Sequence, residues 1–305
     1  MGSTEALRAA GLDTRRIDDL IRAALAEDLG GGVDVTSVAT VPADQVATMD
    51  LTARAAGVIA GLPVAARVFE IGSGGTCVTT PVRSDGERVQ RGEVVLSVEG
   101  LTRSLLVCER TALNLLCHLS GVATTTALWA DALSGTGARV RDTRKTTPGL
   151  RELEKYAVRC GGGENHRMGL WDAALVKDNH VVAAGGVAQA FEAVRARFPG
   201  VPVEVEVDSL EQLAAVVAAG ADLVLLDNLT PAQTAEAVAL VAGRCRLESS
   251  GGLSLHVAHA YAATGVDFLA VGALTHSAPV LDVGADLRPV ARGQGAGHGQ
   301  GGAQP

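Results

Sequence analysis

The spacing of apolar residues divides the chain into an N-terminal part that mixes helices with antiparallel strands and a C-terminal part of alternating strands and helices. Residues 17–28 repeat apolar side chains at the period of a helix, and this pattern ends at Gly30. Residues 46–100 alternate apolar and polar positions between frequent glycines, which predicts short antiparallel strands. A long helix, interrupted only at Gly121, is predicted for residues 111–133.

Beyond residue 133 the pattern changes to short apolar runs separated by helical segments. This alternation favours parallel strands, since each helix carries the chain back to the start of the next strand. Both a barrel and an open sheet fit the pattern. Strands are predicted at residues 139–142, 173–177, 203–207, 222–226, 245–248 and 267–271, and helices at 187–198, 209–219, 231–242 and 255–264.

The balance of charges points to a small partner molecule. The chain has 26 Lys and Arg residues against 34 Asp and Glu residues, a net charge of −8. This disfavours a non-specific nucleic-acid binder, which would hold phosphates with a surplus of basic side chains. The 26 basic residues comprise 23 arginines and only three lysines, Lys145, Lys155 and Lys177. Lysines kept in such an arginine-rich chain are candidates for a specific task.

Cysteine usage and the absence of long apolar runs indicate the cellular location. The five cysteines are an odd number without a Cys-x-x-Cys spacing, so we expect buried thiols in a reducing cytosol. The chain shows neither a signal peptide nor 18 consecutive apolar residues, which predicts a cytoplasmic protein that does not span a membrane. The segment 293–305 is rich in Gly, Gln and Ala, and we expect it to be disordered.

Residues 85–96 resemble the hairpin of biotinyl and lipoyl carrier domains. Those domains carry their cofactor on a lysine at the hairpin tip. No lysine precedes Lys145, so nothing here can be modified, and we interpret the segment as a structural hairpin.

Polar residues or glycines follow every predicted strand of the C-terminal part. Functional side chains of parallel α/β folds gather at this edge of the sheet. A charge beside one strand is common in any such protein, but six polar strand ends together favour a cavity. Residues 139–167 contain eight basic and four acidic residues, so we expect this cavity to attract an anion. The six ends are 142–146, 177–180, 206–208, 227–228, 248–252 and 271–273.

Two groups of residues at these ends suit anions. His166 and Arg167 follow a glycine loop, and the planar guanidinium group of arginine pairs well with carboxylates. The loops containing Ser250–Gly252 and Gly272 have the position of a barrel phosphate site, where free backbone N–H groups face the anion. A P-loop and a dinucleotide-binding motif are both absent from the sequence, which favours cofactor-free chemistry on a phosphorylated substrate.

The acidic residues Glu206 and Asp227 end neighbouring predicted strands. They could hold Mg²⁺ against phosphate oxygens, or face a sugar on which positive charge develops. His256 and His259 have no nearby third ligand, so we interpret them as surface or packing residues and expect no zinc site.

Longer motifs connect these strand ends. They are Glu27–Gly30, Glu109–Asn114, Asp142–Gly149, Glu154–Val158, Gly161–Arg167, Lys177–His180, Glu204–Val207, Leu226–Asn228 and Glu248–Gly252. Through them the chain resembles the quinolinate phosphoribosyltransferase family over nearly all of residues 17–288. This resemblance implies an N-terminal α/β sandwich domain and an incomplete parallel β/α barrel of six to seven strands.

We therefore expect a sandwich domain at residues 1–116, a catalytic barrel domain at 117–274, and a segment 275–292 that packs back on the first domain. The resemblance implies a pentosyltransferase that converts quinolinate and 5-phosphoribosyl 1-pyrophosphate to nicotinate mononucleotide, pyrophosphate and CO₂, a step of NAD synthesis. It also implies Mg²⁺ accompanying the pyrophosphate, no organic cofactor, and a homodimer or a higher assembly such as a hexamer.

The resemblance further implies a role for each site residue. Arg144, His166 and Arg167 would hold quinolinate, with Arg110 reaching in from the neighbouring subunit. Four residues would act on the reacting groups: Glu206, Asp227, Lys145 and Lys177. The acidic pair among them would also meet the metal. The remaining substrate-binding residues are Thr143, Ser250, Gly251, Gly252, Val271, Gly272 and Ala273.

Two other enzymes remain as alternatives. A related phosphoribosyltransferase associated with molybdenum transport loci would use a different acceptor, but the Arg and His residues favour a dicarboxylate. A lyase could use Lys177 as an amine nucleophile in a Schiff base. A binding protein without catalytic activity is a third possibility, which no sequence feature favours.

Overall fold

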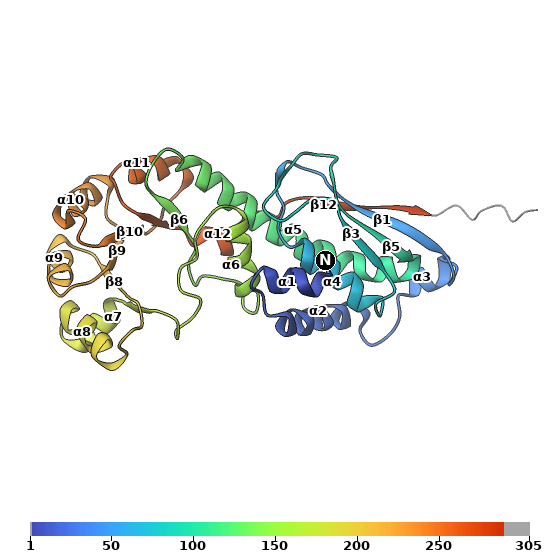
Figure 1. Ribbon diagram of the computed structural model, residues 1–305, viewed down its shortest axis with the longest axis horizontal. Helices are drawn as coiled ribbons and strands as arrows, with labels where there is room; N and C mark the ends of the chain where they lie inside the picture. Colours follow the sequence, from blue (N-terminus) through green and yellow to red (C-terminus); the bar gives the residue numbers. More distant parts are fainter. Residues whose placement is uncertain (1, 290–305) are drawn as a thin grey trace, which may run out of the picture.

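The computed structural model describes residues 2–289, which form an elongated molecule of two parts joined along one long helix (Figure 1). One part contains an antiparallel sheet and the other a parallel sheet. The predicted fold class, a mixed α/β protein with an incomplete parallel barrel, is confirmed. Among the residues described, no helix has the length and apolar content needed to cross a membrane.

The N-terminal part is built on a four-stranded antiparallel sheet in the order β12-β1-β5-β3. Its strands are β1 (Val46–Ala53), β3 (Val78–Pro81), β5 (Val94–Leu101) and β12 (Val283–Pro289). Ala47, Met49 and Leu51 alternate along β1 and are fully buried, because one face of the sheet packs against helices α4 (Leu62–Gly72) and α5 (Thr102–Ala132). The predicted antiparallel strands are therefore present.

The prediction of a hairpin at residues 85–96 is wrong, because the two strands of this segment do not pair with each other. Strand β4 (Arg88–Val89) pairs with β2 (Gly57–Val58), whereas β5 pairs with β1 and β3. Gly92 lies between β4 and β5, and its N–H donates to the carbonyl of Ala53 at 2.8 Å. The chain thus passes from one sheet to another at this turn.

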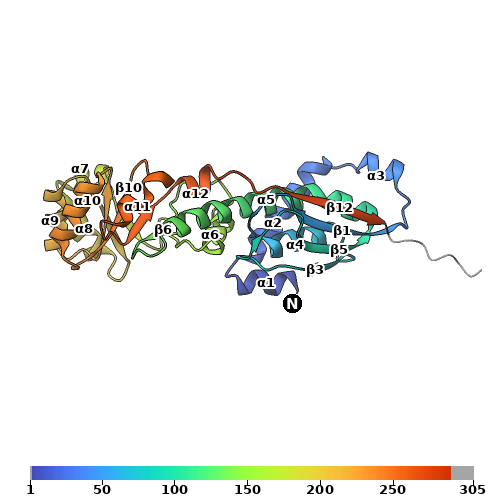
Figure 2. The ribbon, with the colours of Figure 1, turned by 90° about the horizontal axis from the view of Figure 1, so that it is seen from above.

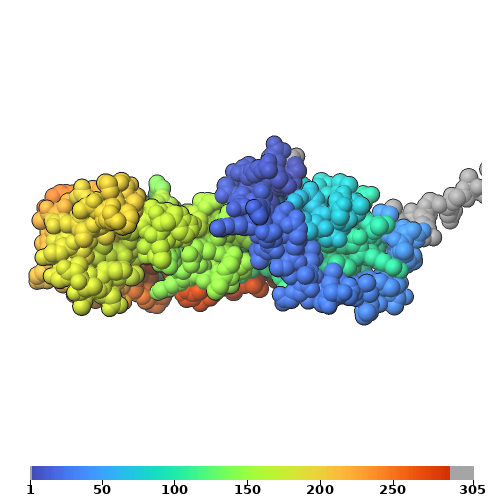
Figure 3. Space-filling model, turned by 90° about the horizontal axis from the view of Figure 1, so that it is seen from below, coloured from blue at the N-terminus to red at the C-terminus, as the bar shows by residue number. Residues whose placement is uncertain are grey.

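The first two helices lie against both parts of the molecule, as Figure 3 shows in dark blue. Helix α2 (Thr14–Leu29) begins where the Asp13 side chain accepts bonds from the backbone and ends at Gly30, which is left-handed with φ of 55°. The Asp13 N–H also donates to Glu152 at 2.6 Å, which ties this end of α2 to helix α6 (Arg151–Cys160). The other early helices are α1 (Ser3–Ala9) and α3 (Val35–Thr40).

Helix α5 (Thr102–Ala132) joins the two parts and is longer than predicted. It begins nine residues before residue 111 and runs through Gly121 without interruption. A Cβ atom at Gly121 would lie 2.2 Å from the carbonyl oxygen of Pro279, so the glycine lets another segment approach the helix closely. The predicted domain boundary at residue 117 falls inside this helix.

The C-terminal part is a six-stranded parallel sheet in the order β6-β11-β10-β9-β8-β7. Strands β6 and β7 are its two edges and do not pair with each other, so the barrel is open. All six predicted strands are present within a few residues of the expected bounds: β6 (Arg139–Arg141), β7 (Ala174–Val176), β8 (Val203–Val207), β9 (Leu223–Asp227), β10 (Arg246–Ser250) and β11 (Phe268–Ala270).

The helices of this part follow the strands as expected, with one difference. The predicted helix 255–264 is a 3₁₀ turn (Leu255–Val257) followed by the short helix α11 (Ala258–Ala262). The others are α6 (Arg151–Cys160), α7 (Asp178–Ala184), α8 (Val187–Arg197), α9 (Leu210–Ala218), α10 (Pro231–Val241) and α12 (Ala273–His276). After α12 the chain returns to the first part, where β12 pairs with β1. The predicted disordered tail 293–305 lies outside the described residues.

Candidate active site

A cavity of about 640 Å³ lies at the carboxyl ends of the six parallel strands. Parallel pairing brings these ends to one edge of the sheet, although the residues are up to 130 positions apart in the sequence. Every predicted site residue except Arg110 lines this cavity: Thr143, Arg144, Lys145, His166, Arg167, Lys177, Glu206, Asp227, Ser250, Gly251, Gly252, Val271, Gly272 and Ala273.

Arg110 lies elsewhere, on the N-terminal half of α5, where it is exposed and outside the cavity of its own chain. Its predicted role requires a second subunit. The position on α5 leaves the side chain available to another molecule.

Arg144 and Arg167 form a cationic wall of the cavity. The Nε atom of each is buried without a hydrogen-bond partner, and within residues 2–289 neither side chain forms an ion pair. Arg167 donates through Nη1 to the carbonyl of Ala173 at 3.2 Å. Burial, and then the nearby Arg144, lowers the pKa of the Arg167 guanidinium. Two half-buried cations, each with a buried Nε atom that has no acceptor, make this wall suitable for binding negative charge.

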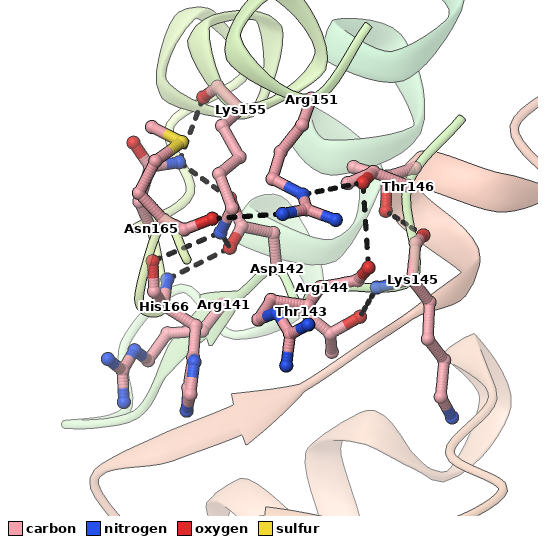
Figure 4. A network of polar contacts seen from close by, with 12 residues as sticks. Arg141, Asp142, Thr143, Arg144, Lys145, Thr146, Arg151, Lys155, Asn165 and His166 are labelled. Atoms are coloured by element: carbon pink, nitrogen blue, oxygen red, sulfur yellow. Dashed lines mark hydrogen bonds and ion pairs between the residues drawn. The ribbon is translucent and has the colours of Figure 1, made fainter. Parts of the chain in front are cut away.

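A buried network around Asp142 holds this wall in place (Figure 4). Asp142 accepts bonds from the N–H of His166 at 2.9 Å and from Asn165 Nδ2 at 2.6 Å, and it forms an ion pair with Lys155. Lys155 also donates to the carbonyl of His166 at 3.0 Å. Both charged side chains are fully buried, and burial raises the pKa of Asp142 and lowers that of Lys155. The network fixes the backbone that presents His166 and Arg167.

Lys145 and Lys177 differ from Lys155, because they line the cavity. In Figure 4 the side chain of Lys145 extends away from the Asp142 network. Lys177 lies at the end of β7 and forms an ion pair with Glu206, at the end of the neighbouring strand β8. The one lysine that the sequence could not assign, Lys155, is therefore structural.

The acidic side of the cavity consists of Glu206 and Asp227. They belong to adjacent parallel strands, β8 and β9, so their carboxylates lie at the same edge of the sheet. Asp227 accepts a hydrogen bond from Asn228 Nδ2 at 2.8 Å. Carboxylate oxygens facing a cavity of this size are suitable ligands for Mg²⁺ that arrives with a phosphate compound.

Glycines shape the remaining side of the cavity. Gly251 has φ of +101°, and a Cβ atom there would lie 2.1 Å from Asn228 Oδ1. A Cβ atom at Gly272 would lie 2.9 Å from the Lys145 side chain. Any larger residue at these two positions would fill the space beside the backbone, so both glycines keep room for an anion close to the main chain.

Three polar cavity residues were not among the predicted site residues: Asn228, Glu248 and His276. Asn228 and Glu248 lie within polar strand ends that the sequence analysis recognised. Nothing in the sequence, however, separated these two residues from the neighbouring polar residues that were selected. His276 lies on α12, beyond the last strand, where no pattern marks it.

Two family models cover the chain, the N-terminal domain of quinolinate phosphoribosyl transferase at residues 34–120 and its C-terminal domain at 122–286. The chain belongs to the quinolinate phosphoribosyltransferase family. It is 56% identical over 274 residues to the carboxylating nicotinate-nucleotide pyrophosphorylase of Mycobacterium leprae, covering 88% of this chain and 96% of that protein.

Further relatives agree with this membership. A probable enzyme of the same name from Bacillus subtilis is 38% identical, covering 86% of this chain and 90% of that protein. The crystal structure of NadC from Streptococcus pyogenes is similar with a TM-score of 0.88 and 43% identity, covering 92% of this chain and 99% of that one. The family and the open parallel barrel expected from the sequence motifs are thus confirmed.

Proposed function

We propose that the protein transfers the phosphoribosyl group of 5-phosphoribosyl 1-pyrophosphate to the ring nitrogen of quinolinate. The pyridine carboxyl group next to that nitrogen is lost, and the products are nicotinate mononucleotide, pyrophosphate and CO₂, as in NAD synthesis. The observation that carries this proposal is one cavity whose lining combines Arg144 and Arg167, which form no ion pair among the described residues, with the carboxylates of Glu206 and Asp227.

The cationic wall matches a dicarboxylate. Arg144 and Arg167 each have a buried N–H group without an acceptor, and His166 lies beside them. A hydrogen bond to a charged group contributes about 1.5–3 kcal/mol net, so two guanidinium groups are needed to offset the desolvation of two carboxylates. A substrate with one carboxylate would leave part of this wall unpaired.

The acidic side suits the sugar at the moment of transfer. Positive charge develops on the ribose carbon as pyrophosphate departs, and Glu206 and Asp227 stabilise that charge electrostatically. Lys145 and Lys177 act as point charges on the pyrophosphate. The same two carboxylates would hold Mg²⁺ that accompanies this substrate, and the metal would neutralise phosphate charge there.

The glycine loops hold the other phosphate group. Ser250, Gly251 and Gly252 follow β10, and Val271 to Ala273 follow β11, so backbone N–H groups from two neighbouring loops face the 5-phosphate. Thr143, in the loop after β6, also binds the substrate. These contacts orient the ribose between the acceptor ring and the acidic pair.

The active assembly is a homodimer or a larger assembly in the cytoplasm. Arg110 completes the quinolinate site of the neighbouring subunit, since it is exposed and outside its own cavity. A reducing compartment suits the five cysteines, all of which are free thiols.

The lyase alternative is disfavoured by Lys177. A Schiff base requires an amine that is free to attack a carbonyl group, whereas the Lys177 Nζ atom is held in an ion pair with Glu206. Two arginines and a histidine likewise favour quinolinate over an acceptor without two carboxylates.

The proposal is tested by turnover of the purified protein with quinolinate, 5-phosphoribosyl 1-pyrophosphate and Mg²⁺, with nicotinate as a parallel acceptor. We expect nicotinate mononucleotide and CO₂ from quinolinate and no product from nicotinate. Binding of the phosphoribosyl donor without turnover of either acceptor would assign a different acceptor. Trapping of the protein by borohydride with a carbonyl substrate would favour the lyase.

A further inference from the structure

Two glutamates that no step above uses lie beneath the cationic wall. Glu204 on β8 and Glu248 on β10 point toward His166, and all three side chains are at least nine-tenths buried. His166 Nε2 is hydrogen-bonded to Glu204 and lies 4.0 Å from Glu248 Oε1. Glu248 also belongs to the lining of the cavity, and its side chain has no solvent-exposed surface in the free protein.

Glu248 has an oxygen atom without a partner. Its Oε2 atom accepts from Arg141 on β6, but its Oε1 atom is buried without any hydrogen bond. An ionised carboxylate can only accept, so a bare anionic oxygen at this depth is costly. A proton on Oε1 lowers that cost, because the group is then neutral, and it turns the atom into a donor.

The charged groups around Glu248 favour this neutral form. Burial, and then the charge of Glu204, raises the pKa of Glu248 to about 8, while Arg141 acts in the opposite direction. Asp142, at the end of β6, adds a further negative charge. The neighbouring strands place Phe268 and Leu225 beside Glu248, and neither can supply a compensating charge.

The proposed reaction needs a proton donor at this place. When the C–C bond to the departing carboxyl group breaks, CO₂ leaves and the electron pair stays on the ring carbon next to the pyridinium nitrogen. A new C–H bond must then form from that pair and a proton. Lys177 and His166 are engaged with Glu206 and Glu204, and guanidinium groups do not release protons.

We propose that Glu248 is the acid that donates the proton replacing the departing carboxyl group. This inference rests on the proposed function. Donation leaves Glu248 as a carboxylate held by Arg141, and a proton from water restores the acid after the product leaves. The proton consumed balances the C–H bond formed, and no oxidant or reductant takes part.

The test is a single-turnover experiment on Glu248→Gln that follows pyrophosphate separately from CO₂ and nicotinate mononucleotide. Glutamine is neutral and keeps an oxygen for Arg141, but it cannot donate an acidic proton. We expect pyrophosphate release to stay close to wild type, and CO₂ and nicotinate mononucleotide to form about 100-fold more slowly, the range of general acid catalysis. The mononucleotide that still carries both carboxyl groups should accumulate.

The matched control is Glu236→Gln, an exposed position on α10 outside the cavity, which should leave both rates unchanged. Equal loss of pyrophosphate and CO₂ in Glu248→Gln would assign Glu248 to binding or folding and overturn the proposal. Unchanged CO₂ formation would do so as well. A wild-type protein that releases no pyrophosphate would instead overturn the proposed function itself.

A second measurement on the wild-type protein covers the case in which Glu248→Gln does not fold. As pH rises through about 8, Glu248 loses its proton, so CO₂ formation should slow while pyrophosphate release continues. A ratio of the two rates that stays constant between pH 6 and pH 10 would overturn the proposal.

Discussion

Whether a charged side chain has a partner inside the protein separates structural residues from candidate substrate-binding residues. Lys155 is fully buried but paired with Asp142, so it supports the fold. Arg144 and Arg167 are held in position without an anion, which is unfavourable in the free protein and favourable once a dicarboxylate binds. Basic side chains in neighbouring parts of the structure therefore have different roles, one stabilising the fold and two suited to bind a substrate.

Replacing an arginine of the cationic wall should weaken quinolinate binding. Arg144→Ala or Arg167→Ala each removes a charged contact present before and during transfer, so KM for quinolinate should rise about 10- to 100-fold with little change in kcat. Steady-state kinetics at saturating phosphoribosyl donor measures this. Arg15→Ala, on the exposed face of α2, is the control. An unchanged KM would contradict the assignment of the wall.

Replacing the acidic residue opposite the wall should affect turnover instead. Glu206→Gln keeps the size of the side chain but removes the negative charge, so kcat should fall about 100-fold, as when one preorganised charge contact is lost. The activity is measured at increasing Mg²⁺, with the exposed Glu211→Gln as control. Full recovery at high Mg²⁺ would show that Glu206 only binds the metal.

The sequence predicted the position of a site residue wherever that residue ends a strand that the apolar pattern identifies. Glu206 and Asp227 could be placed together because each ends an apolar run that reads as a parallel strand. The burial of individual lysine side chains could not be predicted from the sequence in this way. Lys155 and Lys177 look equally unusual in the sequence, and only the packing of α6 shows that one is enclosed.

At the scale of elements, packing against a distant segment explains why helix α5 contains a glycine and still continues through it. The sequence predicted an interruption of α5 at Gly121, since glycine weakens a helix. In the structure the helix is continuous, and the glycine provides space for the backbone at Pro279 and Val280. A local pattern cannot reveal such a contact, because its partner lies more than 150 residues away.

The contact at Gly121 can be tested through stability. In Gly121→Ala the new methyl group would meet the Pro279 carbonyl oxygen at 2.2 Å, and overpacking of this kind costs about 1–3 kcal/mol. Tm should fall by several degrees in a thermal melt. Gly137→Ala, where a Cβ atom has nothing within 4 Å, is the control. Equal Tm values for the two variants would contradict this account of the helix.

Strand pairing shows the same limit of sequence interpretation. Residues 85–96 have the composition of a hairpin, yet β4 pairs with β2, some thirty residues earlier. Register between such strands depends on tertiary packing, which the alternation of one segment does not encode.

At the scale of the whole molecule, the proposed assembly has a direct test. In the proposed shared site, Arg144 comes from one subunit and Arg110 from its neighbour. Arg110→Ala and Arg144→Ala therefore remove contacts that different subunits supply. In a mixed dimer, one of the two sites keeps both arginines, so mixing the two variants under subunit exchange should restore about a quarter of the wild-type sites. Turnover at a quinolinate concentration near the wild-type KM, where each variant alone is nearly unsaturated, measures this. Turnover that stays at the level of the separate variants after confirmed exchange would contradict a shared site.

The length of α5 has a consequence for how substrates enter and leave. A helix of 31 residues is about 46 Å long, and here it is a single stiff rod embedded in both parts of the molecule (Figure 2). Bending it would break backbone hydrogen bonds in the buried middle of the rod, so the two parts cannot close on each other like jaws about a hinge. Substrates therefore enter and leave the cavity without a change in the angle between the two parts of the molecule.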